Sequence, residues 1–228
     1  MHTSKLGRSV LFAVLLPCLL FLGCPRDYEP YVPNAGIRVA CVGDSVTYGF
    51  TIANRDERAY PAQLNALLGE DYGVANFGVN NATIVREGSK PYHLEEAYAE
   101  ALAFQPHIVV ISLGGNDTMS LNWEHIDTFV EDYAALITSF AELETAPMIY
   151  VCYPTPAFTE NPLFSGERIR EELLPLIDQV IAETDTRLID LHTPLRESPE
   201  LFPDDMHPND EGAGIIARIV QDAIVGNS

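Results

Sequence analysis

Short apolar runs alternate with longer amphipathic stretches along most of this chain. The amphipathic stretches place apolar residues three and four positions apart, as in helices with one buried face; they are 60–68, 94–104, 123–143, 167–183 and 210–225. The short runs are typical of buried β-strands; they are 37–42, 73–77, 107–113, 147–153 and 187–191.

This alternation predicts one α/β domain. Strands that are apolar on both sides favour a parallel sheet covered by helices on both faces, which makes a three-layer α/β/α sandwich. Ligands bind such sheets beyond the carboxyl ends of the strands. Candidate functional residues should therefore follow the strands directly.

The first 23 residues have the form of a secretory signal peptide. Lys5 and Arg8 precede an apolar run over 10–22, which at about 13 residues is short of the ~20 that a membrane-spanning helix needs. The run ends on Phe21-Leu22-Gly23-Cys24, which resembles a bacterial lipoprotein signal with Cys24 as the lipidated residue. We expect an exported bacterial protein held on a membrane by this lipid, in the periplasm or at the cell surface; simple secretion is the alternative.

A short tether and a single domain should follow the signal. Residues 24–36 hold three prolines and a glycine without periodicity, as expected of a linker. Residues 37–228 are enough for one sizeable core and too few for two ordinary domains.

Charge and cysteine usage exclude some classes of protein. With 33 acidic against 13 basic residues and a formal charge of −20, the surface is a poor partner for nucleic acid. Cys41 and Cys152 lie inside predicted strands, so we expect two small buried core residues. A disulfide between them is the alternative.

Polar residues that can carry out acyl transfer follow the predicted strands. Ser45 lies in Gly43-Asp44-Ser45 after the first strand, Asn116 lies in Gly114-Gly115-Asn116-Asp117 after the third, and Asp204-Asp205-Met206-His207 precedes the last helix. A serine hydroxyl attacks an ester once a base takes its proton and an acid holds that base in place. Each segment alone could be an ordinary turn or helix cap. Their joint occurrence at strand ends favours a catalytic site.

These segments make the chain resemble the SGNH hydrolases, also called the GDSL esterase and lipase family, from about residue 37 to 225. The resemblance implies a flavodoxin-like fold with a five-stranded parallel sheet. It further implies Ser45 as nucleophile, His207 as base, Asp204 as its orienting acid, and the Asn116 side chain as an oxyanion donor beside the Ser45 N–H.

The second block of the family departs from the usual pattern. Where the family has an oxyanion-hole glycine, five residues after Asn76, this chain has Asn81. A backbone N–H can come from any residue but proline, and asparagine tolerates positive φ. We therefore expect Asn81 to complete the oxyanion hole, and Gly78 to be a turn residue.

Other assignments of the base and the acid are weaker. Asp205 competes with Asp204, but the family spacing selects Asp204 and leaves Asp205 in a solvated turn. Structural roles are more ordinary for the remaining histidines outside the leader: His93, His107, His125 and His192. No pair of them has metal-ligand spacing, and the mechanism needs no metal or cofactor. The α/β-hydrolase arrangement is excluded, because Thr47 stands where its Gly-x-Ser-x-Gly motif around the nucleophile requires the second glycine.

The substrate is the least defined part of this interpretation. The overall sequence is most similar to bacterial sialate O-acetylesterases and other carbohydrate deacetylases, which implies removal of short acyl groups from glycans. A lysophospholipase or an acyl thioesterase is the alternative within enzymes, and a non-catalytic glycan-binding lipoprotein is the alternative outside them. Candidates for the substrate pocket are the proline-rich and aromatic segment 153–166 and three aromatic side chains: Tyr48, Tyr92 and Trp123.

Overall fold

The computed structural model describes residues 36–159 and 164–226. They form a five-stranded sheet in the order β2-β1-β3-β4-β5, with every neighbouring pair parallel. The strands are β1 (Ile37–Gly43), β2 (Tyr72–Gly78), β3 (Ile108–Ser112), β4 (Met148–Tyr153) and β5 (Arg187–Asp190). The predicted fold class and all the predicted strands are confirmed, with ends that differ by one residue at most.

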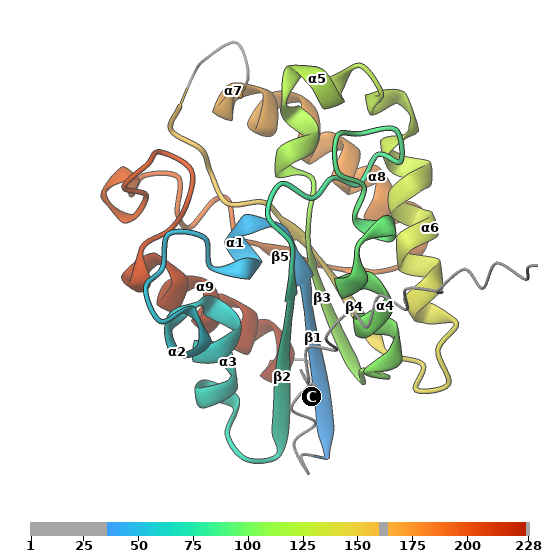
Figure 1. Ribbon diagram of the computed structural model, residues 1–228, viewed down its shortest axis with the longest axis vertical. Helices are drawn as coiled ribbons and strands as arrows, with labels where there is room; N and C mark the ends of the chain where they lie inside the picture. The colour runs from blue at the N-terminus through green and yellow to red at the C-terminus, as the bar shows by residue number, and fades with distance from the viewer. Residues whose placement is uncertain (1–35, 160–163, 227–228) are drawn as a thin grey trace, which may run out of the picture.

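Helices cover both faces of this sheet. The α-helices are α1 (Ser45–Tyr48), α2 (Arg55–Arg58), α3 (Tyr60–Leu68), α4 (Glu96–Ala103), α5 (Ser120–Trp123), α6 (Phe129–Ala141), α7 (Gly166–Arg168), α8 (Leu174–Thr184) and α9 (Asp210–Val225). Between them lie the 3₁₀ turns η1 (Tyr92–Leu94), η2 (Gly115–Thr118), η3 (Ile126–Thr128) and η5 (Pro199–Leu201), and the π-helical turn η4 (Ile169–Leu173). Helices α3 and α9 lie on one face, and α4, α6 and α8 on the other (Figure 1).

The alternation of side chains along β1 divides the core into two layers. Val39 and Cys41 pack with α3 and α9, whereas Ala40 and Val42 pack with α4, α6 and α8. Cys41 and Cys152 are buried free thiols, so the expected core role is confirmed and the disulfide is wrong. Burial raises the pKa of the Cys41 thiol to about 12, which keeps it protonated and unreactive.

Two predicted helices are interrupted. The stretch 123–143 contains the end of α5, then η3, then α6; the stretch 167–183 contains most of α7, then η4, then α8. Pro175 at the start of α8 has no N–H, and its ring would clash with the carbonyl four residues earlier. A regular helix cannot run through that point, and the π-helical turn stands there instead.

The strand order creates the crevice. The chain winds from β1 to β2 in one direction and from β3 to β5 in the other, so the connections diverge beyond the carboxyl ends of β1 and β3, the point where doubly wound sheets bind ligands. Ser45 follows β1 and Asn116 follows β3. Topology therefore brings these two predicted site residues to the same crevice.

Residues 1–35 lie outside the described residues, so the predicted signal peptide, tether and lipidated Cys24 stay predictions. No helix in the parts of the chain that the structure describes is long and apolar enough to cross a membrane.

Candidate active site

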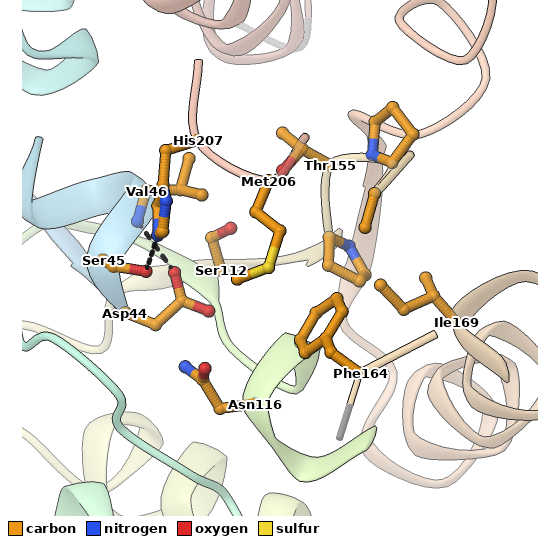
Figure 2. A pocket seen from close by; sticks show the side chains of 14 residues that line it. Asp44, Ser45, Val46, Ser112, Asn116, Thr155, Phe164, Ile169, Met206 and His207 are labelled. Carbon is orange, nitrogen blue, oxygen red and sulfur yellow. Dashed lines mark hydrogen bonds between the residues drawn. The ribbon is translucent and has the colours of Figure 1, made fainter. Parts of the chain in front are cut away.

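A hydrogen-bonded chain of three side chains lies beyond the end of β1. The Ser45 Oγ lies 2.9 Å from His207 Nε2 (Figure 2), and His207 Nδ1 lies 2.7 Å from Asp204 Oδ2. Ser45 and His207 are nearly buried, at 9% exposure each. These distances allow the imidazole to take the serine proton while the carboxylate fixes the ring tautomer.

Ser45 is presented by a short helix that begins directly after β1. Asp44 is the N-cap of α1, and its carboxylate accepts a hydrogen bond from the Val46 N–H at 3.0 Å. As the first residue of α1, Ser45 has no helical acceptor for its own N–H. This N–H is thus available to a negatively charged oxygen beside the Ser45 hydroxyl.

Two glycines let α1 approach the sheet this closely. Gly43 and Gly78 are paired in register at the ends of β1 and β2. A Cβ on Gly78 would lie 2.2 Å from the Tyr48 nitrogen, and one on Gly43 would lie 2.0 Å from Thr47 Oγ1. Gly78 is therefore the last residue of a strand under α1 rather than the turn residue that the sequence suggested.

Asp204 is held by the turn that leads into α9. Its Oδ1 accepts hydrogen bonds from the Met206 and His207 N–H groups at 3.1 and 2.7 Å. Burial acts to raise the Asp204 pKa, but these bonds and the His207 ring outweigh burial and hold the pKa below its usual range. Asp205 has a left-handed backbone with φ of 66°, and it is exposed. The orientation of the two carboxylates agrees with the choice of Asp204.

Asn116 and Ser45 line the same small cavity. Its side chain is 8% exposed, and one amide hydrogen is donated to the Ala82 carbonyl at 3.1 Å. An amide carries two hydrogens, and the second has no acceptor among the described residues. This geometry suits the oxyanion donor that the sequence indicates.

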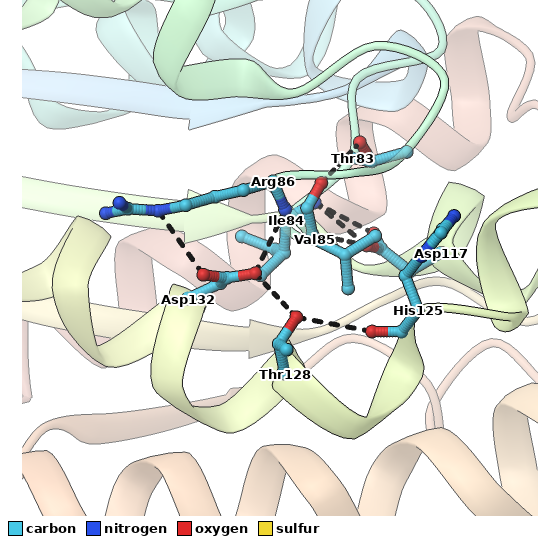
Figure 3. Close-up of polar contacts among 8 residues, drawn as sticks. All are labelled: Thr83, Ile84, Val85, Arg86, Asp117, His125, Thr128 and Asp132. Carbon is cyan, nitrogen blue, oxygen red and sulfur yellow. Dashed lines mark hydrogen bonds and ion pairs between the residues drawn. The ribbon is translucent and has the colours of Figure 1, made fainter.

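The loop that carries Asn81 is held by two carboxylates. Asp117, which is fully buried, accepts hydrogen bonds from the Ile84 and Val85 N–H groups at 2.9 and 2.8 Å, and Asp132 accepts from the Arg86 N–H at 2.9 Å (Figure 3). Burial raises the pKa of Asp117 to about 7, because desolvation and the nearby Asp44 outweigh these bonds.

Asn81 has a φ of 64°, which explains why a glycine suits this position. It is not among the residues that line the cavity beside Ser45, so its role as an oxyanion donor stays a prediction.

A small cavity of about 40 Å³ opens beside the serine. Phe164, Ile169, Met206 and the segment 154–157 supply much of its apolar lining. Of the predicted pocket segment 153–166, residues 154–157 and Phe164 line this cavity; that they contact substrate stays a prediction.

The three aromatic candidates are wrong for this cavity. Tyr92 is buried and donates to the Phe77 carbonyl, Tyr48 lies under the Arg55 guanidinium, and Trp123 lies near that of Arg168.

Sequence reasoning also missed two contacts. Met206 lines the cavity, and Phe50, 45% exposed, packs its ring 4.9 Å from the His207 ring. In the sequence, the one sign of these contacts is that Phe50 lies close to Ser45 and Met206 directly precedes His207.

The other histidines take other roles. His107 accepts a hydrogen bond from the Arg38 N–H, His125 lies beside Glu87, and His192 is buried after β5. Among residues 36–159 and 164–226, no group of three or more His, Cys, Asp or Glu side chains is arranged to hold a metal ion.

A hydrogen-bonded serine, histidine and aspartate at the carboxyl edge of a parallel sheet define the class of serine hydrolases. Residues 41–215 match the GDSL-like lipase/acylhydrolase family, and the chain belongs to this family.

Relatives and solved structures agree with that family. The chain is 36% identical over 213 residues to an acetylxylan esterase of Xylanibacter ruminicola, an alignment that covers 86% of this chain and 44% of the relative. The chain thus spans less than half the length of that protein. Its fold is similar to that of a carbohydrate acetylesterase from Sinorhizobium meliloti, with a TM-score of 0.66, 19% identity, and 84% and 100% of the two chains covered. It is also similar to an acetyl xylan esterase, with a TM-score of 0.64, 22% identity, and 82% and 100% covered.

Proposed function

We propose that this protein is a serine esterase that removes acetyl or other short acyl groups from carbohydrates. The single observation that carries the proposal is the hydrogen-bonded chain Asp204–His207–Ser45 beside a cavity of about 40 Å³. By the same measure one water needs about 10–15 Å³. This space suits an acetyl group, and a long acyl chain would have to extend beyond it.

The mechanism follows from the positions of the groups. Ser45 Oγ attacks the ester carbonyl while His207 Nε2 takes its proton, and the imidazolium is stabilised by Asp204. The oxyanion is held by the N–H groups of Ser45 and Asn81 and by the Asn116 amide. The acyl carbon–oxygen bond to the sugar then breaks as His207 gives its proton to the leaving sugar oxygen, and water repeats the sequence on the acyl-enzyme to release the acid.

The carbohydrate part of the proposal is supported by the relatives. The acetylxylan esterase of Xylanibacter ruminicola is named for an acetylated glycan, and one structural neighbour is a two-domain esterase active on acetylated mannans. That neighbour is 19% identical with a TM-score of 0.64, so it supports the fold rather than the substrate. We propose an acetylated plant-type glycan as the substrate class.

Hydrolysis of p-nitrophenyl esters from acetate to palmitate tests the acyl preference. We expect activity on acetate and butyrate that is lost in Ser45→Ala and falls steeply with longer chains. Activity that rises with chain length would assign a lipase or thioesterase instead. Absence of any Ser45-dependent hydrolysis would leave a glycan-binding lipoprotein.

We also propose that the protein is exported and anchored through a lipid on Cys24. The support is the leader pattern of residues 1–23, in which an apolar run between Arg8 and Cys24 is too short to span a membrane. Metabolic labelling with a palmitate analogue tests this. The wild-type protein should be labelled and Cys24→Ala should not; equal labelling of both would refute the anchor.

A further inference from the structure

A second cavity lies directly beside the catalytic one. It has a volume of about 270 Å³ and shares Pro156 and Ala157 with the catalytic cavity as lining residues. It also lies beside η4, where Ile169 lines the first cavity and Arg170 the second. A substrate that places an acyl group beside Ser45 can therefore extend into this space.

His192, which follows β5, also lines this second cavity. Its side chain is only 6% exposed, and its Nδ1 is buried without a hydrogen-bond partner. Burial lowers the His192 pKa, which keeps the ring neutral.

Two arginines also line this cavity, Arg170 from η4 and Arg196 from the loop after β5. Both lie close enough to act on the pKa of His192. Each is about half exposed and forms an ion pair with its own sequence neighbour, Glu171 at 2.9 Å and Glu197 at 3.4 Å.

Exposed ion pairs of this kind contribute ~1 kcal/mol at most. They also leave most of the five guanidinium donors of each arginine for other partners. Two arginines beside one cavity in a chain of charge −20 are a local exception to its acidity, even with Glu197 in the lining.

We propose that this second cavity is a subsite for a carboxylated sugar, a uronate residue next to the acetylated sugar of the substrate glycan. Arg170 and Arg196 bind its carboxylate, and the neutral His192 side chain forms part of the wall of the subsite. The volume is near the lower end of the ~300–1,000 Å³ of small-molecule sites, which suits a single sugar unit. The proposal rests on the carbohydrate esterase function proposed above.

Calorimetry with non-acetylated sugars separates the subsite from the chemistry. The probe is a xylo-oligosaccharide that carries one glucuronic acid, and its match is the same molecule with the carboxyl group reduced to an alcohol. We expect the uronate form to bind roughly tenfold tighter, the scale of one charge-assisted hydrogen bond. The difference should shrink as salt is added.

The double variant Arg170→Gln/Arg196→Gln should bind the two sugars equally well. The control is Arg187→Gln, which removes a positive charge from an exposed side chain at the start of β5, whereas His192 follows the end of that strand. It should keep the preference for the uronate form. Equal binding of both sugars by the wild-type protein would overturn the subsite, as would an equal loss of preference in the control.

The two proposals fail in different ways. Uronate preference without hydrolysis of acetylated xylo-oligosaccharides or p-nitrophenyl acetate would keep the subsite and refute the esterase. Hydrolysis of acetylated oligosaccharides with the same KM for the uronate and reduced forms would keep the esterase and refute the subsite.

Discussion

Two adjacent aspartates of the same chemical type have different environments in this protein. Both are exposed, but Asp204 contacts the His207 ring and two backbone N–H groups, whereas Asp205 has a left-handed backbone. The backbone carbonyl of Asp205 accepts the Phe158 N–H at 2.8 Å, and this bond does not involve its carboxylate. The difference between the two residues is thus a difference in side-chain orientation.

The variants Asp204→Asn and Asp205→Asn make a matched test of this difference. Asp204→Asn should lower kcat by roughly 10³- to 10⁴-fold, because an amide favours the wrong tautomer of the His207 ring. Asp205→Asn should stay within about twofold of wild type, since asparagine tolerates the left-handed backbone. Steady-state kinetics on p-nitrophenyl acetate decides, and a severe loss in Asp205→Asn alone would reverse the assignment.

Asn116→Ala tests the oxyanion hole without altering the nucleophile. Removing one oxyanion donor commonly costs ~100- to 1,000-fold in kcat, and we expect this range with a nearly unchanged KM. The Asn116 side chain also bonds the Ala82 carbonyl, so the unfolding free energy must be measured alongside. Near-normal turnover in a folded variant would show that Asn116 is not a donor.

The three residues of the hydrogen-bonded chain could be located from the sequence, because each lies in a motif with short, fixed spacing. The bond between Ser45 and His207 joins residues 162 positions apart, but each lies in a local motif that can be recognised alone. The second cavity has no such motif. Arg170 from η4 and His192 and Arg196 from the loop after β5 line one cavity, and none of these positions carries a local sequence signal of that cavity.

At the scale of elements, the close contact between α1 and β2 positions the nucleophile. A Cβ on Gly78 would lie 2.2 Å from the Tyr48 nitrogen, so Gly78→Ala must displace α1 or the end of β2. We expect a loss of more than about 2 kcal/mol in unfolding free energy, from overpacking, together with a large loss of kcat. Urea unfolding and ester hydrolysis measure the two effects.

Gly36→Ala is the matched control for that variant. A Cβ at Gly36 would have its nearest neighbour, the Asp71 carbonyl, at 4.0 Å, so the stability should change by less than about 0.5 kcal/mol. If Gly78→Ala were equally harmless, α1 would not depend on this contact to hold Ser45.

Element boundaries were predicted best where packing and local pattern agree. Helices α3 and α9 have the predicted ends, because an amphipathic face covers the sheet over their whole length. The single helix predicted over 123–143 was wrong, because the apolar spacing of the sequence continues across the end of α5 and the turn η3 into α6. Thr128 donates its hydroxyl to the Asp132 carboxylate at the start of α6, and such local bonds compete with helical pairing. Periodicity alone does not register that competition.

At the scale of the whole molecule, two buried carboxylates make stability depend on pH. Burial raises the pKa of Asp44 to about 6 and that of Asp117 to about 7, from 3.8. Between about pH 4 and pH 7 the folded state therefore binds more protons than the unfolded chain, and the free energy of unfolding falls as pH rises. Asp204 acts in the opposite sense. Because its pKa is lowered in the folded state, it stabilises the fold while it is ionised, and this contribution is lost as the pH falls through that lowered pKa.

Asp117→Asn should remove the larger part of this dependence. An asparagine oxygen can still accept the Ile84 and Val85 N–H groups but carries no charge to bury at neutral pH. Urea unfolding at pH 5 and pH 8 should show a decrease for the wild-type protein that exceeds the decrease for the variant by a few kcal/mol. Asp205→Asn, which removes an exposed carboxylate, should keep the wild-type decrease. Equal decreases in all the proteins would mean that Asp117 is ionised in the native state at pH 5, held by its backbone hydrogen bonds against the cost of burial.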